Sequence, residues 1–168
     1  MTARSVIHDT FCIERSYLAA PARVFAAFAS EEAKQAWGDL EDTGPAAGQA
    51  GATEFEFRVG GRERFGFALQ DTTYRYDARY YDIVPDQRII YSYEMYANDV
   101  RISVSVTTIE FIKSGEGTDL VYTEQGSYLD GIDGPGAPGL RNDGTIEMLD
   151  NLTAYLQSPP PVAAPAAS

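Results

Sequence analysis

Alternation of apolar and polar residues dominates the middle of the chain. Residues 53–125 divide into about six short segments, in most of which every second residue is apolar, as in strands with one buried face. The segments are residues 53–59, 62–69, 74–84, 88–96, 100–113 and 118–125. Because the connections between them are short enough for hairpins, the pattern predicts an antiparallel meander.

Irregularities in this alternation predict turns and bulges. Gly60-Gly61 separates two alternating segments, and two glycines suit a two-residue hairpin turn because both can adopt positive φ. The apolar phase changes between Tyr80 and Tyr81, and again between Val106 and Ile109. A change of phase within a strand indicates a β-bulge, so we expect one at each place.

The segment before the meander predicts one strand and two short helices. Residues 10–18 alternate as a first strand, and Pro21 follows, where a proline can begin a helix because its missing N–H is not needed there. Ser30, with Glu31 and Glu32 after it, is a favourable N-cap for a second helix. We expect that helix to end at Trp37-Gly38.

A longer helix is predicted near the end of the chain, over residues 144–157. Apolar residues recur there at steps of three and four and would form one buried stripe. Its members are Ile146, Leu149, Leu152 and Leu156, widened by Met148 and Tyr155. A single helix after a run of strands would cover their apolar face.

These elements together predict an α+β fold, in which a curved antiparallel sheet of about seven strands wraps a long C-terminal helix. At 168 residues the chain can form one domain with a sizeable core. We expect that domain over residues 10–157, preceded by a loose lead-in at 1–9. Residues 39–52 and 128–143 are expected to be loops, and the Pro/Ala-rich residues 158–168 a disordered tail.

The charge balance excludes several kinds of partner. There are 25 acidic and 13 basic residues, for a formal net charge of −12. Such a field repels nucleic acid and anionic membranes, so neither is expected as a partner. The sequence shows no signal peptide and no apolar run long enough to cross a bilayer, which predicts a cytoplasmic protein.

Metal and cofactor chemistry lacks the residues that it needs. His8 and Cys12 are the only histidine and the only cysteine, which leaves too few ligands for a zinc site and no base for a catalytic triad. The glycines at 134, 136 and 139 match a dinucleotide-binding motif only formally, because Pro135 and Pro138 remove N–H donors that would hold phosphate. We therefore expect neither a metal nor a cofactor.

Glu124 is the main candidate for chemistry. It alternates with Leu120 and Tyr122, so the three share one strand face. If that face is concave, Glu124 is a carboxylate among aromatic rings, where it could anchor a ligand or act as a general acid/base. The structural alternative is a carboxylate paired with an arginine such as Arg15 or Arg62.

Aromatic residues supply the other candidates. Eleven tyrosines and eight phenylalanines are many for the length, and although most suit strands and core packing, together they favour an aromatic-lined pocket. The predicted ligand-binding residues are Trp37, Phe57, Phe67, Tyr80, Tyr91, Tyr93, Tyr122, Glu124, Tyr128 and Met148.

Several stretches, in order, resemble the START-like helix-grip (SRPBCC, Bet v-like) superfamily, in the branch similar to the activator of heat-shock-protein ATPase. They are residues 14–25, 57–61, 82–91, 117–126 and the helix containing Leu149, Leu152 and Leu156. The resemblance implies the same helix-grip fold. Since the superfamily includes carriers, cyclases and co-chaperone domains, it implies no single activity, and the chain lacks the separate N-terminal domain of two-domain activators.

Three functional hypotheses follow. The leading one is that a small apolar or aromatic molecule binds in a cavity between the sheet and the C-terminal helix. The second is an enzyme of cyclase or hydrolase type with Glu124 as acid/base, which the shortage of histidine weakens. The third is a module that contacts a chaperone. The sequence leaves open whether the protein is a monomer or a homodimer.

Overall fold

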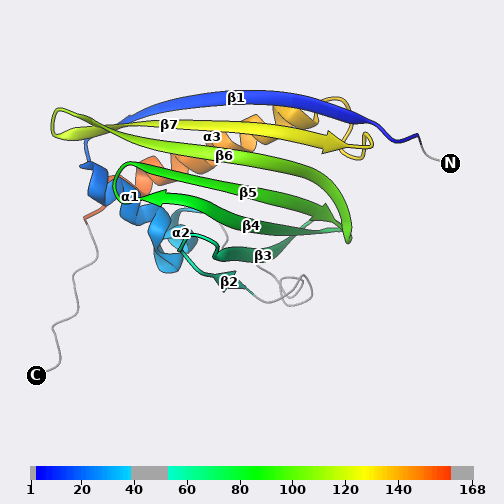
Figure 1. The fold of residues 1–168 in the computed structure, drawn as a ribbon, viewed down its shortest axis with the longest axis horizontal. Coiled ribbons are helices and arrows are strands. Elements are labelled where there is room, and N and C mark those ends of the chain that lie inside the picture. Colours follow the sequence, from blue (N-terminus) through cyan, green and yellow to red (C-terminus); the bar gives the residue numbers. More distant parts are fainter. Residues whose placement is uncertain (1–2, 39–52, 160–168) are drawn as a thin grey trace, which may run out of the picture.

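The computed structural model describes residues 3–38 and 53–159 and shows a seven-stranded antiparallel sheet with three helices (Figure 1). The strands are β1 (Val6–Tyr17), β2 (Glu54–Phe55), β3 (Arg62–Leu69), β4 (Thr72–Val84), β5 (Arg88–Ala97), β6 (Val100–Ser114) and β7 (Gly117–Leu129). The helices are α1 (Pro21–Ala29), α2 (Glu31–Trp37) and α3 (Ala137–Gln157). The predicted α+β fold, a curved sheet on a long C-terminal helix, is confirmed.

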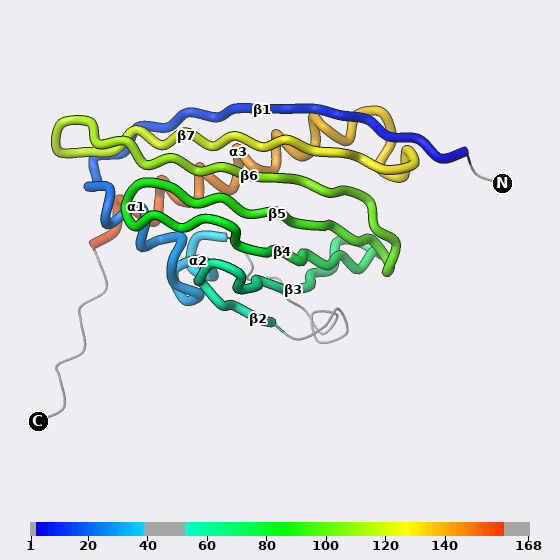
Figure 2. The backbone as a smooth tube through the Cα atoms, in the orientation of Figure 1, coloured from blue at the N-terminus to red at the C-terminus, as the bar shows by residue number. Residues whose placement is uncertain are grey.

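The strand order is β1-β7-β6-β5-β4-β3-β2 (Figure 2). Strands β2 to β7 therefore form the predicted meander, and β1 joins it by pairing with β7. The edges of the sheet are β1 and β2. Because β7 lies between β1 and β6, Glu124 is placed in the interior of the sheet rather than at an edge.

The helices lie on one face of the sheet. α3 runs along β1, β7 and β6 (Figure 1) and packs against β1 and β7, while α1 packs against β6 and β7. Pro21 occupies the first turn of α1, and the hydroxyl of Ser30 accepts a hydrogen bond from the N–H of Ala33 at 3.3 Å. Both short helices therefore begin as predicted, and α2 also ends as predicted, at Trp37.

The core forms between this face of the sheet and the helices. Leu149 and Leu152 of α3 are fully buried, as are Ile109 and Leu120 of the sheet. At the end of the sheet near α1, aromatic rings from both layers meet edge to face, with centroids 5.1–5.7 Å apart, a favourable arrangement for aromatic pairs. Dense apolar packing thus fills this end of the domain.

The two edge strands, β1 and β2, both differ from the prediction. β1 begins at Val6, so residues 6–9 pair with β7 and do not form a lead-in. β2 ends at Phe55, and the chain reaches β3 through a longer connection than the two-residue turn at Gly60-Gly61. Gly61 has no room for a side chain, because a Cβ there would lie 2.1 Å from the carbonyl oxygen of Glu56.

One of the two predicted bulges is present and the other is wrong. The register of β4 and β5 shifts between Tyr80 and Asp82, as predicted. β6, however, pairs with β7 without interruption from Ser103 to Ser114, and its irregularity lies nearer its start, opposite Met95 and Tyr96 of β5. The apolar phase misled the prediction because Val106 faces outward, while small hydroxyl residues face inward. These inward residues are Ser103, Ser105 and Thr107.

The long helix begins earlier than predicted, at Ala137 instead of Gly144. Pro138 lies in its first turn, where a proline is tolerated, and Ala137 is buried. Tertiary contacts therefore outweigh the low helix propensity of Gly139 and Gly144, each about 1 kcal/mol worse than alanine. The predicted loop over 128–143 shrinks accordingly, because β7 also extends to Leu129.

Other predictions fall where the structure cannot address them. The expected loop at 39–52 and the tail from residue 160 lie outside the described residues. Among the helices of the described ranges, none is long and apolar enough to cross a membrane.

Truncating the buried stripe of α3 should destabilise the protein strongly. Leu149 is fully buried whereas Leu140, on the same helix, is 67% exposed. We expect Leu149→Ala to lower the free energy of unfolding by about 2–5 kcal/mol through lost burial and a cavity. Leu140→Ala should change it by less than about 0.5 kcal/mol. Urea denaturation measures both, and similar values for the two variants would contradict the packing described.

Candidate functional site

Glu124 lies on the inner face of β7, the strand beside the edge strand β1. In the register it is opposite Phe11 of β1 and Thr107 of β6. Its side chain is 1% exposed, so the carboxylate is almost entirely removed from water. Because burying a charged group without partners is costly, the arrangement around it matters both for stability and for chemistry.

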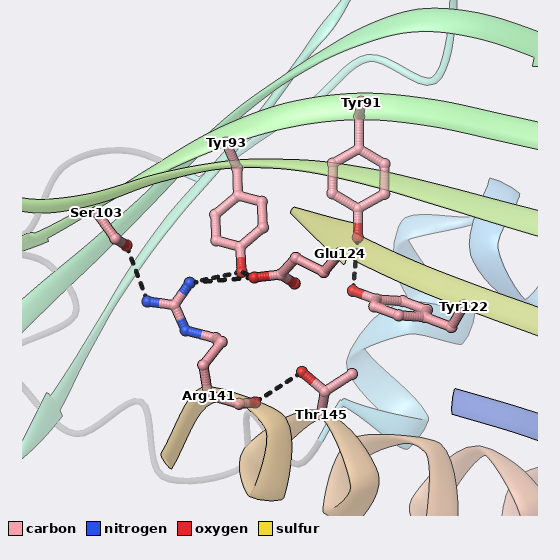
Figure 3. A network of polar contacts seen from close by, with 7 residues as sticks. All are labelled: Tyr91, Tyr93, Ser103, Tyr122, Glu124, Arg141 and Thr145. Atoms are coloured by element: carbon pink, nitrogen blue, oxygen red, sulfur yellow. Dashed lines mark hydrogen bonds and ion pairs between the residues drawn. The ribbon is translucent and has the colours of Figure 1, made fainter. Parts of the chain in front are cut away.

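A tyrosine and an arginine contact the carboxylate (Figure 3). The hydroxyl of Tyr93 on β5 donates to Oε1 of Glu124 at 2.6 Å. Arg141, from the second turn of α3, donates to the Tyr93 hydroxyl at 2.7 Å and approaches the same Oε1 at 3.5 Å. Its other terminal nitrogen donates to the hydroxyl of Ser103 at 2.9 Å. The network therefore joins β5, β6, β7 and α3.

Arg141 is held by rings as well as by oxygens. Its guanidinium lies 5.4 Å from the ring centroids of both Tyr93 and Tyr128, within the range of cation–π attraction. Burial alone would lower the pKa of Arg141, but Tyr93 and Glu124 outweigh that effect and raise it above its ordinary value. The side chain thus provides a permanent positive charge beside Glu124.

A second pair of tyrosines adjoins this network. The hydroxyls of Tyr91 and Tyr122 lie 3.1 Å apart, and either can be the donor (Figure 3). Burial raises the pKa of both side chains well above 10.0. These hydroxyls therefore keep their protons at neutral pH and act as hydrogen-bonding groups, not as bases.

Three polar atoms in this region remain without a partner. Oε2 of Glu124 and the hydroxyls of Ser105 and Thr107 are buried, and no described residue forms a hydrogen bond with any of them. Buried polar atoms are almost always paired in folded proteins. The site therefore offers unused hydrogen-bonding capacity beside an aromatic wall.

The predicted ligand-binding residues divide into two groups. Five lie together beside Arg141: Tyr91, Tyr93, Tyr122, Glu124 and Tyr128. Trp37, Phe57 and Tyr80 belong to the aromatic packing near α1 and α2. Phe67 stacks on Tyr74 at 5.2 Å, and Met148 of α3 packs against the core.

Sequence reasoning missed Arg141, because that residue fell in the predicted loop. The partners expected for Glu124 lie elsewhere, since Arg15 pairs with Asp150 at 3.4 Å and Arg62 with Asp77 at 3.0 Å. The signal that could have found Arg141 is helical spacing, because it lies four residues before Thr145 and eight before Leu149, both buried on α3.

A second buried carboxylate, Glu63 on β3, is fully occupied. The ammonium group of Lys34 donates to both of its oxygens, at 2.7 and 2.6 Å. The Tyr80 hydroxyl donates to Oε2 at 2.6 Å. This cluster ties α2 to the sheet and leaves no free acceptor, so it is best understood as structural. The described ranges also hold no group of three acidic, histidine or cysteine residues arranged for a metal.

Residues 18–157 match the family described as activator of Hsp90 ATPase homolog 1-like protein. No match is found among curated proteins. Among solved structures, protein Mll3558 from Rhizobium loti is 43% identical, with a TM-score of 0.79 over 90% of this chain and 99% of that one. An uncharacterised protein from Rhizobium leguminosarum is also 43% identical, with a TM-score of 0.82 over 93% and 99%. Protein CV1439 from Chromobacterium violaceum is 26% identical, with a TM-score of 0.70 over 89% and 98%.

Removing Arg141 should expose the cost of burying Glu124. We expect Arg141→Met to lower the free energy of unfolding by roughly 3–5 kcal/mol, because a buried charge loses its partner. Adding Glu124→Gln should restore much of the loss. Arg15→Met, at a partly exposed ion pair, should cost under about 1 kcal/mol. Chemical denaturation of these three variants and of Glu124→Gln alone tests this, and additive effects of the two site substitutions would contradict coupling.

The buried tyrosines should make the protein unfold in alkali. Burial raises the pKa of Tyr76, Tyr91, Tyr93 and Tyr122 well above the usual 10.0. Below pH 10 these groups are protonated in both states, so their contribution is complete. Above it only the unfolded chain loses the protons, and stability falls by about 1.4 kcal/mol per pH unit for each tyrosine.

Tyrosinate absorbance and circular dichroism, followed together during a titration with base, measure this effect. Ionisation of the four tyrosines should coincide with loss of the native spectrum. Ionisation of every tyrosine in a protein with an unchanged native spectrum would show that these hydroxyls are not buried as described.

Proposed function

Because the chain belongs to the family of activator of Hsp90 ATPase homolog 1-like proteins, whose fold places a sheet around a helix, we propose that it binds a small, largely aromatic molecule between its sheet and α3. The observation that carries this proposal is the buried but incompletely paired carboxylate of Glu124 among tyrosines. Binding sites for small molecules are mostly apolar, with a few polar groups that fix orientation.

A row of rings across the inner face of the sheet supports the proposal. Tyr93 lies 4.9 Å from Tyr76, Tyr76 lies 4.8 Å from Phe65, and Phe67 stacks on Tyr74. The helices pack mainly on β1, β6 and β7, so this row lies beyond their principal contacts. The rings of the row provide flat apolar surface on which an aromatic ligand could lie.

Tyr76 lies at the centre of this row and keeps partial exposure. Burial raises the pKa of its hydroxyl well above 10.0, with Tyr91 and Glu63 adding to the shift, so the group stays protonated and can hydrogen-bond a ligand. Met148, on the facing helix, is also only partly buried.

An enzyme is the second candidate, and the contact between Tyr93 and Glu124 favours it. A buried carboxylate beside a tyrosine hydroxyl could move a proton on a carbonyl substrate. Against it, Arg141 and Tyr93 both occupy Oε1, which suits an anchor better than a base. If a substrate is found, Glu124→Gln should abolish its turnover under this hypothesis. Turnover that persists in the variant would show that Glu124 is not the acid/base.

The family description also suggests contact with a chaperone. That hypothesis predicts that the protein alters the rate of ATP hydrolysis by Hsp90, which a direct assay can measure. Contact with a chaperone would involve the surface of the domain and not the buried Glu124 network. Chaperone contact and ligand binding can therefore be tested separately.

Binding should be visible in the protein as purified and in a pair of blocking variants. Native mass spectrometry should show a mass excess that denaturation removes. Ser105 faces inward from β6, whereas Thr108 on the same strand faces outward. Ser105→Phe should fill the proposed space and abolish both the mass excess and binding of the uncharged aromatic dye N-phenyl-1-naphthylamine, while Thr108→Phe should preserve both.

Stability separates this proposal from a packed interior. Inserting a large ring into a filled core costs about 1–3 kcal/mol or more, so a strong loss of stability in Ser105→Phe would indicate that no space exists. Absence of any retained molecule, together with no dye binding by the unmodified protein, would contradict the proposed function.

A further inference from the structure

The Glu124 carboxylate is satisfied at one oxygen only. Oε1 accepts from Tyr93 at 2.6 Å and faces Arg141 at 3.5 Å. Oε2 is buried, and no donor among the described residues reaches it. A buried acceptor without a donor is unfavourable, so the protein gains when something else supplies one. Oε2 is therefore a position at which a donor is missing.

Ser105 provides a second unpaired polar group beside it. Ser105 is opposite Tyr93 on β5 and Gly126 on β7, while Glu124 is opposite Thr107. Glu124 and Ser105 are therefore diagonal neighbours on the same face, which places their side chains within reach of one small ligand group. Gly126 contributes no side chain here, and a Cβ at that position would lie 3.0 Å from the Tyr128 ring.

The charges at this place favour an uncharged ligand. Arg141 lies 3.5 Å from Glu124, so the pair has no net charge, and the neighbouring tyrosines stay protonated because burial raises the pKa of Tyr93 and Tyr122. Arg141 would repel a cationic ligand, and Glu124 would repel an anionic one. A neutral group that donates a hydrogen bond is repelled by neither residue.

We propose that Glu124 Oε2 and the Ser105 hydroxyl recognise a hydrogen-bond donor, a hydroxyl or an N–H, on an uncharged aromatic ligand. This inference rests on the proposed function and names the class of molecule that the site selects. The donor group pairs with Oε2, the Ser105 hydroxyl pairs with the same group or its neighbour, and the apolar rest of the ligand lies along the tyrosine and phenylalanine rings.

The first turns of α3 provide the way in. Oε2 has no contact with solvent in this structure, so part of the structure must move before a ligand reaches it, and Arg141 of α3 is the charged group that faces this carboxylate. Residues 137–144 contain Gly139 and Gly144, at which an added Cβ would meet nothing. Neither glycine is required by packing, yet each weakens the helix. Arg141 supplies hydrogen bonds from this segment to the sheet, and Ala137 is buried at its start. The segment can open without disturbing the buried leucines farther along.

A matched pair of probes tests the selectivity. 2-Naphthol and 2-methoxynaphthalene have the same ring system, but only the first can donate a hydrogen bond. Isothermal titration calorimetry should show that 2-naphthol binds about tenfold more tightly, the difference expected when a buried acceptor gains its partner. Equal affinities would overturn this inference and leave the proposed function standing. Failure of both probes to bind would overturn both.

Two variants locate the preference at Glu124. In Glu124→Gln the amide oxygen should keep the contacts with Tyr93 and Arg141, which places an amide N–H₂ where Oε2 was. The preference for 2-naphthol should then disappear or invert. Glu110→Gln, an exposed residue on the outer face of β6, should retain it. Ser105→Ala should reduce the preference by severalfold, so the test survives if Glu124→Gln fails to fold.

Variants that stabilise α3 test whether its first turns open to admit the ligand. Gly139→Ala and Gly144→Ala together should raise the thermal stability and slow the association of 2-naphthol severalfold, because the open state becomes rarer. Neither residue contacts the probe site, so selectivity should not change. Raised stability with an unchanged association rate would show that α3 does not open for the ligand.

Discussion

The contact between Arg141 and the sheet is the interaction on which the rest of the site depends. It joins the start of α3 to Tyr93, Ser103 and Glu124, which lie on three different strands. Without Arg141, Glu124 would be an unpaired charge in the interior, a cost of several kcal/mol. Without Glu124, the buried guanidinium of Arg141 would lose the opposite charge that offsets the cost of its burial. Burial of each group therefore depends on the other.

This mutual dependence explains why the order of helices and strands could be predicted while the partner of Glu124 could not. Alternation and capping are local signals, and they correctly placed Pro21, Ser30 and the strand face shared by Leu120, Tyr122 and Glu124. The Glu124–Arg141 pairing depends on tertiary structure. The Gly- and Pro-rich composition of residues 128–143 argued against a helix there, so the sequence pattern hid the residue that completes the site.

The inner face of β6 illustrates a second limit of sequence patterns. Its outward Val104 and Val106 look like a buried stripe, whereas the inward residues are Ser103, Ser105 and Thr107. The rule that apolar residues face the core assigns the two faces of β6 wrongly, because strands seldom turn polar residues toward the interior. The exception is informative, since small hydroxyl residues facing inward leave space and hydrogen-bonding capacity where bulky apolar residues would fill the core.

The domain therefore combines two kinds of interior. Near α1 and α2, rings from sheet and helices pack edge to face and the Glu63 carboxylate is fully paired. Near the start of α3, a carboxylate oxygen and a serine hydroxyl are left unpaired beside aromatic rings. Packing near α1 and α2 stabilises the fold, so the region near the start of α3 need not be fully packed or fully paired. A fold stabilised at one end can tolerate an incompletely satisfied site at the other, and this division is what allows the Glu124 region to be built for a ligand.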